Sequence, residues 1–399
     1  MKKGYNWGVE WKRDADIKTG VEVVKLCDHA AHSHHFYFTN PGWHDHNNRL
    51  VFGGDRMNCS NLFSIDLRSG EITQLTGFAD RPDGGFILSC VNLVTNEVNF
   101  WHDRKLWALS LDTLEEHLLW TLPQGRNGDM LNPTADGKFI MTITNEDLSG
   151  RLKLDLLHGY LGMNEYWAAK PLCHVVRVPV DGSGKAEILH AGNVWMGHMN
   201  TSSTQPAHLT FCHEGPWNKV ENRIWAMDTA TGKVWPLREH RNPDECVGHE
   251  YWLADGERVG YQVFDKGKKT IGTIRHDGTD CVEHEFPCHS THVHSNDESV
   301  IVGDGAPGGI SPGNSMKGDR GCVLLWKKNA AGYDPTRIVC IHRCSMHIQT
   351  SHVHPRLSPD GSHVLFTSDK SGYASPYIAK LPKDISTLPF AEGQESAQK

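Results

Sequence analysis

The feature that most limits the fold is a two-part phrase that recurs seven times along the 399-residue chain. Each copy opens with a turn that carries Asp, Asn or Gly, followed by an alternating apolar strand, as in residues 45–55 and 357–369. A strand, a turn that usually carries Gly and another strand follow, as in residues 62–76 and 223–237. Period-2 strands in a repeat of roughly fifty residues are typical of propeller blades. The sequence therefore predicts an all-β, seven-bladed β-propeller.

The two ends of the chain are predicted to share one blade. The last copy of the phrase lacks its final strand, and residues 21–26 form a strand that belongs to no other copy. Pairing this N-terminal strand with the last blade closes the ring and removes an exposed sheet edge. Residues 1–399 then form a single propeller domain with insertions at about 145–172 and 306–321. The first insertion carries the best helical pattern, and the second is a Gly-rich loop expected over one face.

Composition argues against several classes of protein. The formal net charge is −8 without basic blocks, which disfavours a nucleic-acid-binding or polybasic membrane surface. No run of about eighteen or more apolar residues is present, so no membrane span is predicted. The 11 cysteines lack the spacing of a disulfide framework, and the N-terminal residues lack an apolar signal-peptide core. We therefore expect a cytoplasmic protein with reduced thiols.

Four of the 26 histidines fall at a similar depth in consecutive predicted blades. The residues before the Asp-containing turn of a blade should form its innermost strand, beside the central channel. His249 and His354 lie six residues before the Asp of that turn, and His292 lies five before. His198 occupies the corresponding stretch of the preceding blade. This register favours one shared site over unrelated core or solvated histidines.

Residues 349–361, QTSHVHPRLSPDG, place an amide and two histidines immediately before a turn. His352 and His354 are two residues apart, so on a strand they would share one face, and Gln349 can converge with them. His292 from the neighbouring blade would complete a set of three imidazoles and an amide oxygen. Mn, Fe, Co, Ni and Zn all accept such ligands, so the set does not select one metal.

Two further histidines compete with His292 for the fourth position. His289, His292 and His294 all lie within six residues. His294 shares a strand face with His292, whereas His289 points the other way if the strand extends that far. The residue that supplies this ligand therefore stays open at the level of spacing.

Charged residues near these motifs have simple alternative roles. On spacing alone, Arg223 is a surface partner for Glu221 or Asp228. Glu214 and Glu250 are the acidic residues nearest the motifs, and a glycosidase would need such a carboxylate pair. Glu250 follows a candidate histidine directly, so on a strand it should point to the opposite face. Hydrolysis is therefore disfavoured.

At this level of detail the chain resembles the oligogalacturonate lyase family. The matching stretches are FCHEGP with the following Arg223, CVGHEYW, STHVHSN with VGDG, and Q-x-x-H-x-H-P ahead of FTSD. YFTN, LVFGGDR, DGGF at residues 83–86 and WMGH also match, so the resemblance covers nearly the whole chain. It implies a seven-bladed propeller, in agreement with the repeats. It also implies an intracellular Mn²⁺-dependent enzyme of pectin degradation that cleaves short oligogalacturonides by β-elimination.

The resemblance also implies roles for individual residues. The metal ligands would be His292, Gln349, His352 and His354. The base would be His249, with Arg223 as a second catalytic residue, and the substrate would be contacted by His198, His213 and Arg223. The expected cofactor is Mn²⁺ or another divalent transition metal, and the expected partner is a small acidic oligosaccharide such as di- or trigalacturonate. A lyase for another uronate oligosaccharide and a non-catalytic sugar- or protein-binding propeller are the alternatives.

Overall fold

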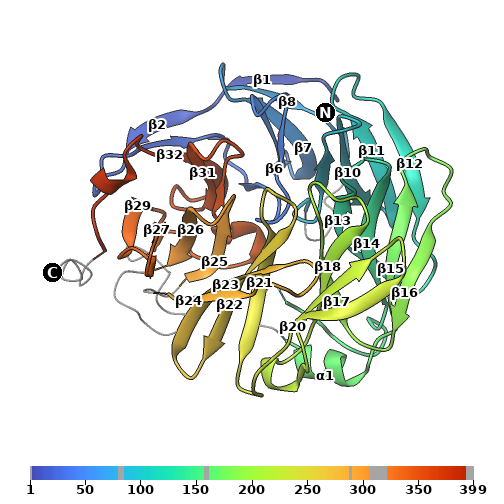
Figure 1. The fold of residues 1–399 in the computed structure, drawn as a ribbon. Helices are drawn as coiled ribbons and strands as arrows, with labels where there is room; N and C mark the ends of the chain where they lie inside the picture. Colours follow the sequence, from blue (N-terminus) through green and yellow to red (C-terminus); the bar gives the residue numbers. More distant parts are fainter. Residues whose placement is uncertain (1, 80–84, 157–160, 287–289, 306–320, 392–399) are drawn as a thin grey trace.

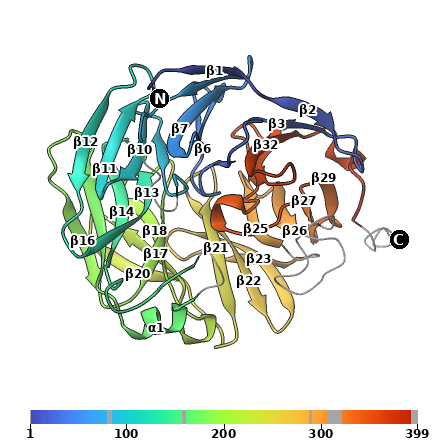
Figure 2. The ribbon, with the colours of Figure 1, turned by 180° about the vertical axis from the view of Figure 1, so that it is seen from behind.

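Seven antiparallel sheets surround a central axis in the computed structural model, as Figure 1 shows. The structure describes residues 2–79, 85–156, 161–286, 290–305 and 321–391. The view from behind in Figure 2 shows the same ring, with the chain passing from blade to blade around the axis. The all-β, seven-bladed propeller predicted from the repeats is confirmed.

Blades 2 to 5 each contain four strands in sequence order from the axis outward. Blade 2 holds β9 (Cys90–Asn92), β10 (Glu97–His102), β11 (Lys105–Ser110) and β12 (Glu116–Thr121). Blade 3 holds β13 (Arg126–Pro133), β14 (Phe139–Glu146), β15 (Cys173–Pro179) and β16 (Glu187–Gly192). Blade 4 holds β17 (Met196–Thr201), β18 (His208–His213), β19 (Ile224–Asp228) and β20 (Lys233–Arg238). Blade 5 holds β21 (Cys246–Trp252), β22 (Arg258–Asp265), β23 (Lys268–Arg275) and β24 (Val282–Glu285).

The remaining three blades depart from this simple order. Blade 1 holds β4 (Ser33–His34), β5 (Trp43–His44), β6 (Arg49–Arg56), β7 (Cys59–Asp66), β8 (Glu71–Gln74) and β1 (Asn6–Val9). Blade 6 holds β25 (Ser290–Ser295), β26 (Val300–Gly305) and β27 (Cys322–Asn329), with β28 (Gly332–Tyr333) and β29 (Arg337–Ile341) both paired to β27. Blade 7 holds β30 (Arg356–Leu357), β31 (His363–Ser368), β32 (Ser375–Lys380), β3 (Glu22–Lys25) and β2 (Lys12–Ala15).

The ring closes between the N-terminal strand and the last blade, as predicted. β3 pairs antiparallel with β32, and Val23 lies opposite Ala379. Val23 is buried in a cluster that also contains Phe366 and Ala379 from blade 7. The N-terminal segment contributes more than was predicted, because β1 extends blade 1 and β2 extends blade 7. One segment thus adds strands to both blades at the closure.

Side-chain amides join the innermost strands of neighbouring blades. Asn132 Nδ2 donates to the Met199 carbonyl at 2.7 Å, and Asn296 Nδ2 donates to the Ser358 carbonyl at 2.9 Å. The Met199 and Ser358 carbonyls thus accept hydrogen bonds from a side chain of the neighbouring blade. They fix how neighbouring blades sit around the channel, and therefore where their axial side chains meet.

The predicted insertions are only partly within the described residues. The first contains α1 (Met163–Ala168), inside the region with the helical pattern, whereas its residues 157–160 lie outside. Residues 306–320 of the second insertion also lie outside the described part of the chain. Across the described ranges, no helix has the length and apolar character needed to cross a membrane.

Candidate active site

A β-bulge recurs at the same place in the innermost strands of blades 3 to 6. Two residues of β13, β17, β21 and β25 oppose one residue of the next strand. The bulged pairs are Asp129–Met130, His198–Met199, His249–Glu250 and Thr291–His292. His198 and His249 adopt φ values of 49° and 54°, which are uncommon for residues other than glycine. A bulge changes the direction in which a side chain points, so the repeated bulge sets the orientation of these histidines.

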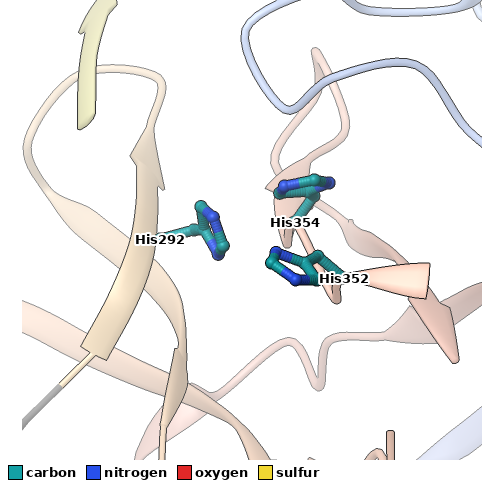
Figure 3. A group of neighbouring side chains, drawn as sticks. All are labelled: His292, His352 and His354. Atoms are coloured by element: carbon teal, nitrogen blue, oxygen red, sulfur yellow. The ribbon is translucent and has the colours of Figure 1, made fainter. Parts of the chain in front are cut away.

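His292, His352 and His354 form a compact group of three imidazoles (Figure 3). Each offers one ring nitrogen, and these nitrogens all lie within 4.8 Å of one another. The ring centroids of His292 and His354 are 4.4 Å apart, and those of His352 and His354 are 5.5 Å apart. His292 and His354 are buried, whereas His352 is partly exposed. Blade 6 and the entry to blade 7 therefore meet at a potential metal site.

The segment that carries two of these histidines is not a strand. Gln349–Ser351 forms a 3₁₀ turn, and His352 has an extended backbone with φ −65° and ψ 149°. His354 has a left-handed φ of 44°, and β30 begins only at Arg356. The expectation that His352 and His354 share a strand face is therefore wrong. Their imidazoles meet through a turned backbone instead.

The competing histidines are separated from this group. His294 lies on β25 with its Nδ1 accepting a hydrogen bond from the Leu357 amide at 3.3 Å, and it is not part of the three-imidazole group. His289 lies outside the described residues. Of the histidines that the structure describes in this stretch, His292 is the one placed beside His352 and His354.

Two unsatisfied buried atoms support a fit to a divalent metal ion. Gln349 Oε1 and His354 Nε2 are buried and have no hydrogen-bond partner within the described ranges. Leaving a buried polar atom without a partner costs free energy, and a metal ion would remove that cost. Burial, together with His292 and His352, holds the pKa of His354 well below its ordinary value. The ring is therefore neutral, as a metal ligand must be.

Asp304 on β26 holds His292 in one orientation. Its Oδ2 accepts a hydrogen bond from His292 Nδ1 at 2.6 Å, and its Oδ1 accepts from the His292 amide at 2.7 Å. Although burial would raise it, the pKa of Asp304 is lowered to about 2 by the charge and hydrogen bonds of His292. A carboxylate can only accept here, so His292 Nδ1 is the donor and Nε2 is the nitrogen that would bind a metal. The predicted motif VGDG contains Asp304, but spacing gave this residue no role.

His249 lies next to the three-imidazole group. Its ring centroid is 5.0 Å from that of His292, and its Nδ1 is 3.3 Å from Gln262 Oε1 on β22. Burial first, and then His292 and Arg223, lower the pKa of His249 well below its ordinary value. A neutral ring that donates from Nδ1 to Gln262 leaves the Nε2 lone pair available to accept a proton. The arrangement suits a general base.

Arg223 is buried between two carboxylates. Its Nη1 donates to Glu214 Oε2 at 3.0 Å, and its Nε lies 3.8 Å from Glu250 Oε2. The surface pairing with Glu221 or Asp228 is therefore wrong, because Arg223 is 6% exposed and bonded elsewhere.

Gly248 leaves room for the buried Arg223 side chain. A Cβ atom at position 248 would lie 3.3 Å from Arg223 Nε and 3.0 Å from the Trp217 ring. The glycine before the bulge thus lets the guanidinium pack directly beneath the innermost strand, close to the base candidate.

His198 is coupled to the same ion pair. Its Nε2 lies 3.0 Å from Glu214 Oε1. Although burial would raise it, Arg223 and His198 hold the pKa of Glu214 well below its ordinary value. His198, Cys212 and Glu214 also lie close enough to form a metal-ligand group, but the Arg223 cation already occupies Glu214. We therefore describe this cluster as an ion pair that orients His198.

His213 is not brought to the axial group. Its ring stacks on Trp225 at a centroid distance of 4.5 Å and lies 6.0 Å from Phe211. Burial lowers its pKa to about 4, so the ring is neutral. The His213 ring thus lies outside the three-imidazole group, although its backbone amide donates to the Arg223 carbonyl at 2.9 Å.

A cavity of ≈ 750 Å³ opens at the end of the central channel where Gln349 and His198 lie. Its lining includes Gln349, His198, Glu214, Tyr37 and Asp129. The volume falls within the range of about 300–1,000 Å³ that is usual for small-molecule sites. A short oligosaccharide could therefore reach Gln349 and His198 from this side.

Asp129 is a cavity residue that sequence reasoning missed. It occupies the bulge of β13, two blades before His249, and burial raises its pKa. The sequence contains a signal for it, because Gly128–Asp129 repeats the pattern of Gly197–His198 and Gly248–His249. Register analysis that considered only histidines could not find it.

Comparison with known proteins agrees with this architecture. The family model for oligogalacturonate lyase matches residues 1–385. The oligogalacturonate lyase of Dickeya dadantii is 28% identical over 408 residues, covering 96% of this chain and 100% of that protein. The oligogalacturonide lyase of Pectobacterium atrosepticum is 28% identical over 403 residues, with the same coverage of both chains.

Solved structures of similar proteins share the fold. An oligogalacturonate lyase in complex with manganese superposes with a TM-score of 0.84 at 25% identity, covering 97% of this chain and 100% of that one. The oligogalacturonate lyase of Vibrio parahaemolyticus also gives a TM-score of 0.84, at 24% identity over 96% of this chain and 99% of that one. Because the family model spans nearly the whole sequence, the chain belongs to the oligogalacturonate lyase family.

Proposed function

We propose that this lyase cleaves short oligogalacturonides by β-elimination with Mn²⁺ bound by His292, Gln349, His352 and His354. The observation that carries the proposal is the three-imidazole group with its unsatisfied Gln349 and His354 atoms, set beside the neutral His249. Family membership supports an oligogalacturonide as substrate. The proposed substrate is a small acidic oligosaccharide such as di- or trigalacturonate.

The chemistry requires charge neutralisation at one carboxylate. In a 4-linked galacturonide, the C5 proton is α to the C6 carboxylate, and its removal places further negative charge on that group. His292, Gln349, His352 and His354 would hold a divalent cation there, which would supply Lewis-acid stabilisation of this charge. Asp304 keeps His292 in the orientation and protonation state that such a ligand needs.

His249 accepts the C5 proton at Nε2 while Gln262 holds its Nδ1. The C5–H electron pair forms the C4=C5 double bond, and the C4–O bond breaks with its electrons on the departing oxygen. That oxygen takes a proton from water or from the newly protonated His249. The product carries a 4,5-unsaturated uronate, and no water is added across the bond.

Arg223 contributes a fixed positive charge next to the base. Burial first, then His292 and this guanidinium, lower the pKa of His249, which keeps the base neutral before the reaction. Once negative charge develops on the substrate, the same cation stabilises it. Glu214 and Glu250 both flank Arg223, so they do not form the opposed carboxylate pair of a glycosidase.

We place the enzyme in the cytoplasm. The cysteines among the described residues are free thiols, and most are buried. Thiols of this kind are typical of a reducing compartment.

The first experiment is ultraviolet absorbance after mixing the enzyme with digalacturonate, with added Mn²⁺ and again with a chelator. A chelator-sensitive rise from the conjugated double bond is the expected result. Bound metal without a rise would move the substrate to another uronate oligosaccharide. Absence of both metal and activity would contradict the metal assignment.

The His249→Ala variant tests the base. Loss of a general base is expected to lower turnover by about 10²- to 10⁴-fold while Mn²⁺ binding stays at the wild-type level. His117→Ala is the control, because His117 lies on the outer strand β12 with its side chain 43% exposed. Wild-type turnover in His249→Ala would refute the assignment.

A further inference from the structure

A second cavity of ≈ 240 Å³ opens at the opposite mouth of the channel. Its lining includes Asn92, Thr134, Ser202, Ala254 and Asn296, at or after the ends of five innermost strands. The first cavity is lined instead by residues at the beginnings of such strands. Because the innermost strands run along the channel, the two cavities lie at its two ends.

Arg356 is the cation of this second cavity. It begins β30, two residues after His354, and it lines the second cavity but not the first. Its Nη1 donates to the Phe38 carbonyl, and no carboxylate forms an ion pair with it within the described ranges. The guanidinium of an arginine is charged at neutral pH. No acidic residue is among the residues that line this cavity with Arg356.

Phe38 separates Arg356 from the metal group. Its side chain is 1% exposed, and its ring centroid lies 5.7 Å from that of His292 and 6.2 Å from that of His354. Its carbonyl accepts a hydrogen bond from Arg356 Nη1. A ligand held by Arg356 would therefore be distinct from a substrate at the metal.

The other walls of the cavity are neutral. Thr201 Oγ1 donates to the Pro133 carbonyl, and Asn132 and Asn296 donate to carbonyls of neighbouring blades. His294 Nδ1 accepts a hydrogen bond from the Leu357 amide at 3.3 Å. Among the residues that line this cavity, Arg356 is thus the charged side chain that can bind an anionic ligand.

We propose that the second mouth is a binding site for a carboxylate the size of one sugar, held by the guanidinium of Arg356. The planar fork of arginine matches the two oxygens of a carboxylate better than a spherical anion. The volume is below the usual range of about 300–1,000 Å³ for drug-sized ligands, which limits the ligand to a monosaccharide acid or a similar small molecule. Trp252 and the neutral polar walls suit a sugar ring.

Calorimetric titration of the chelator-treated full-length enzyme with galacturonate tests the site without turnover. We expect saturable binding that weakens at least tenfold in Arg356→Gln, and no binding of the neutral sugar galactose. Arg68→Gln is the matched control, because Arg68 lies in the turn between β7 and β8 with its side chain 64% exposed, and it should bind galacturonate as the wild type does. If Arg356→Gln fails to fold by circular dichroism, Arg356→Lys, which keeps the charge but not the fork, replaces it.

Three outcomes would overturn the proposal. These are the absence of saturable binding to the chelated wild type, equal affinity in the Arg356 variant, and displacement by sulfate at the same concentration as by galacturonate. Because no metal or lyase activity is involved, failure here is distinguishable from failure of the proposed reaction.

Discussion

At the scale of single residues, a buried carboxylate controls the metal group without being a ligand. Asp304→Asn keeps the shape of the side chain but removes its charge, and an amide nitrogen can face His292 Nδ1 in place of an acceptor. Loss of such a supporting carboxylate typically costs 10- to 100-fold in metal affinity. We expect that loss in a Mn²⁺ titration followed by electron paramagnetic resonance.

The control for this variant is Asp297→Asn. Asp297 lies in the same blade, in the exposed turn before β26, where it accepts from Ser299. Wild-type Mn²⁺ affinity is expected for it. Equal affinities in the two variants would show that Asp304 does not support the site.

Single site residues were predictable where they lie at a fixed distance from the repeated turn. His198, His249, His292 and His354 were found because each precedes a turn that repeats. The partners that orient them were not, since Asp304 and Gln262 belong to second strands, where the register carried no signal. Asp304 and Gln262 take their roles from the residues that they face across the bulges, and a bulge shifts which residues of the two strands are opposite each other.

At the scale of elements, an ion network ties blade 4 to blade 5. Arg238 at the end of β20 donates to Glu245 at 2.9 Å and to Glu283 of β24 at 2.9 Å. Arg238 and Glu245 are 4% and 2% exposed. Removing one partner of a buried pair leaves an unpaired charge, so Arg238→Ala should lower the free energy of unfolding by about 3–5 kcal/mol. Urea denaturation measures this loss.

Arg241→Ala is the matched control for this network. Arg241 reaches the same Glu245 and Glu283, but its side chain is 60% exposed. Exposed pairs contribute about 0–1 kcal/mol, so a small effect is expected. A comparable loss in both variants would mean that burial of Arg238 adds nothing.

The same pair should make stability depend on pH. Although burial would raise it, Arg238 and the Arg241 amide lower the pKa of Glu245 below its ordinary value of 4.5. A folded-state pKa below the unfolded value stabilises the protein above the unfolded pKa, and this stabilisation is lost as pH falls toward the folded value. The difference in unfolding free energy between wild type and Arg238→Ala should therefore shrink below pH 4.5. A constant difference between pH 7 and pH 4 would contradict this linkage.

The elements themselves were predicted well where side chains alternate and poorly where the backbone turns. Alternation in residues 45–55 and 357–369 gave the strands that the structure contains. The turned segment at His352 and His354 was expected to be a strand, because an x-H-x-H pattern is also that of one strand face. The positive φ values at His198, His249 and His354 were not predicted, because histidine adopts this conformation only occasionally and an alternating pattern does not mark where it occurs.

At the scale of the whole molecule, the number of blades follows from the repeat count. Ring closure followed from the incomplete last copy, since a blade that lacks a strand must obtain it elsewhere. The extra outer strand β2 was not predictable, because its sequence KRDA has no apolar alternation and all its residues are exposed. Its backbone pairing with β3 needs no buried side chain.

Closure of the ring is tested by a charge at the strand junction. Val23 is 5% exposed on β3 and packs with Phe366 and Ala379 in blade 7. Val23→Asp would bury an unpaired carboxylate there, so we expect destabilisation of about 4 kcal/mol or more. Val9→Asp is the control, because Val9 lies on β1 at the edge of blade 1 and is 55% exposed, which predicts an effect within about 0.5 kcal/mol. Thermal unfolding of both variants decides the point. Similar melting of the two variants would show that β3 is not needed to hold the ring. Because His352 and His354 lie at the start of blade 7, the Val23 variant should also lose Mn²⁺ affinity as the junction opens.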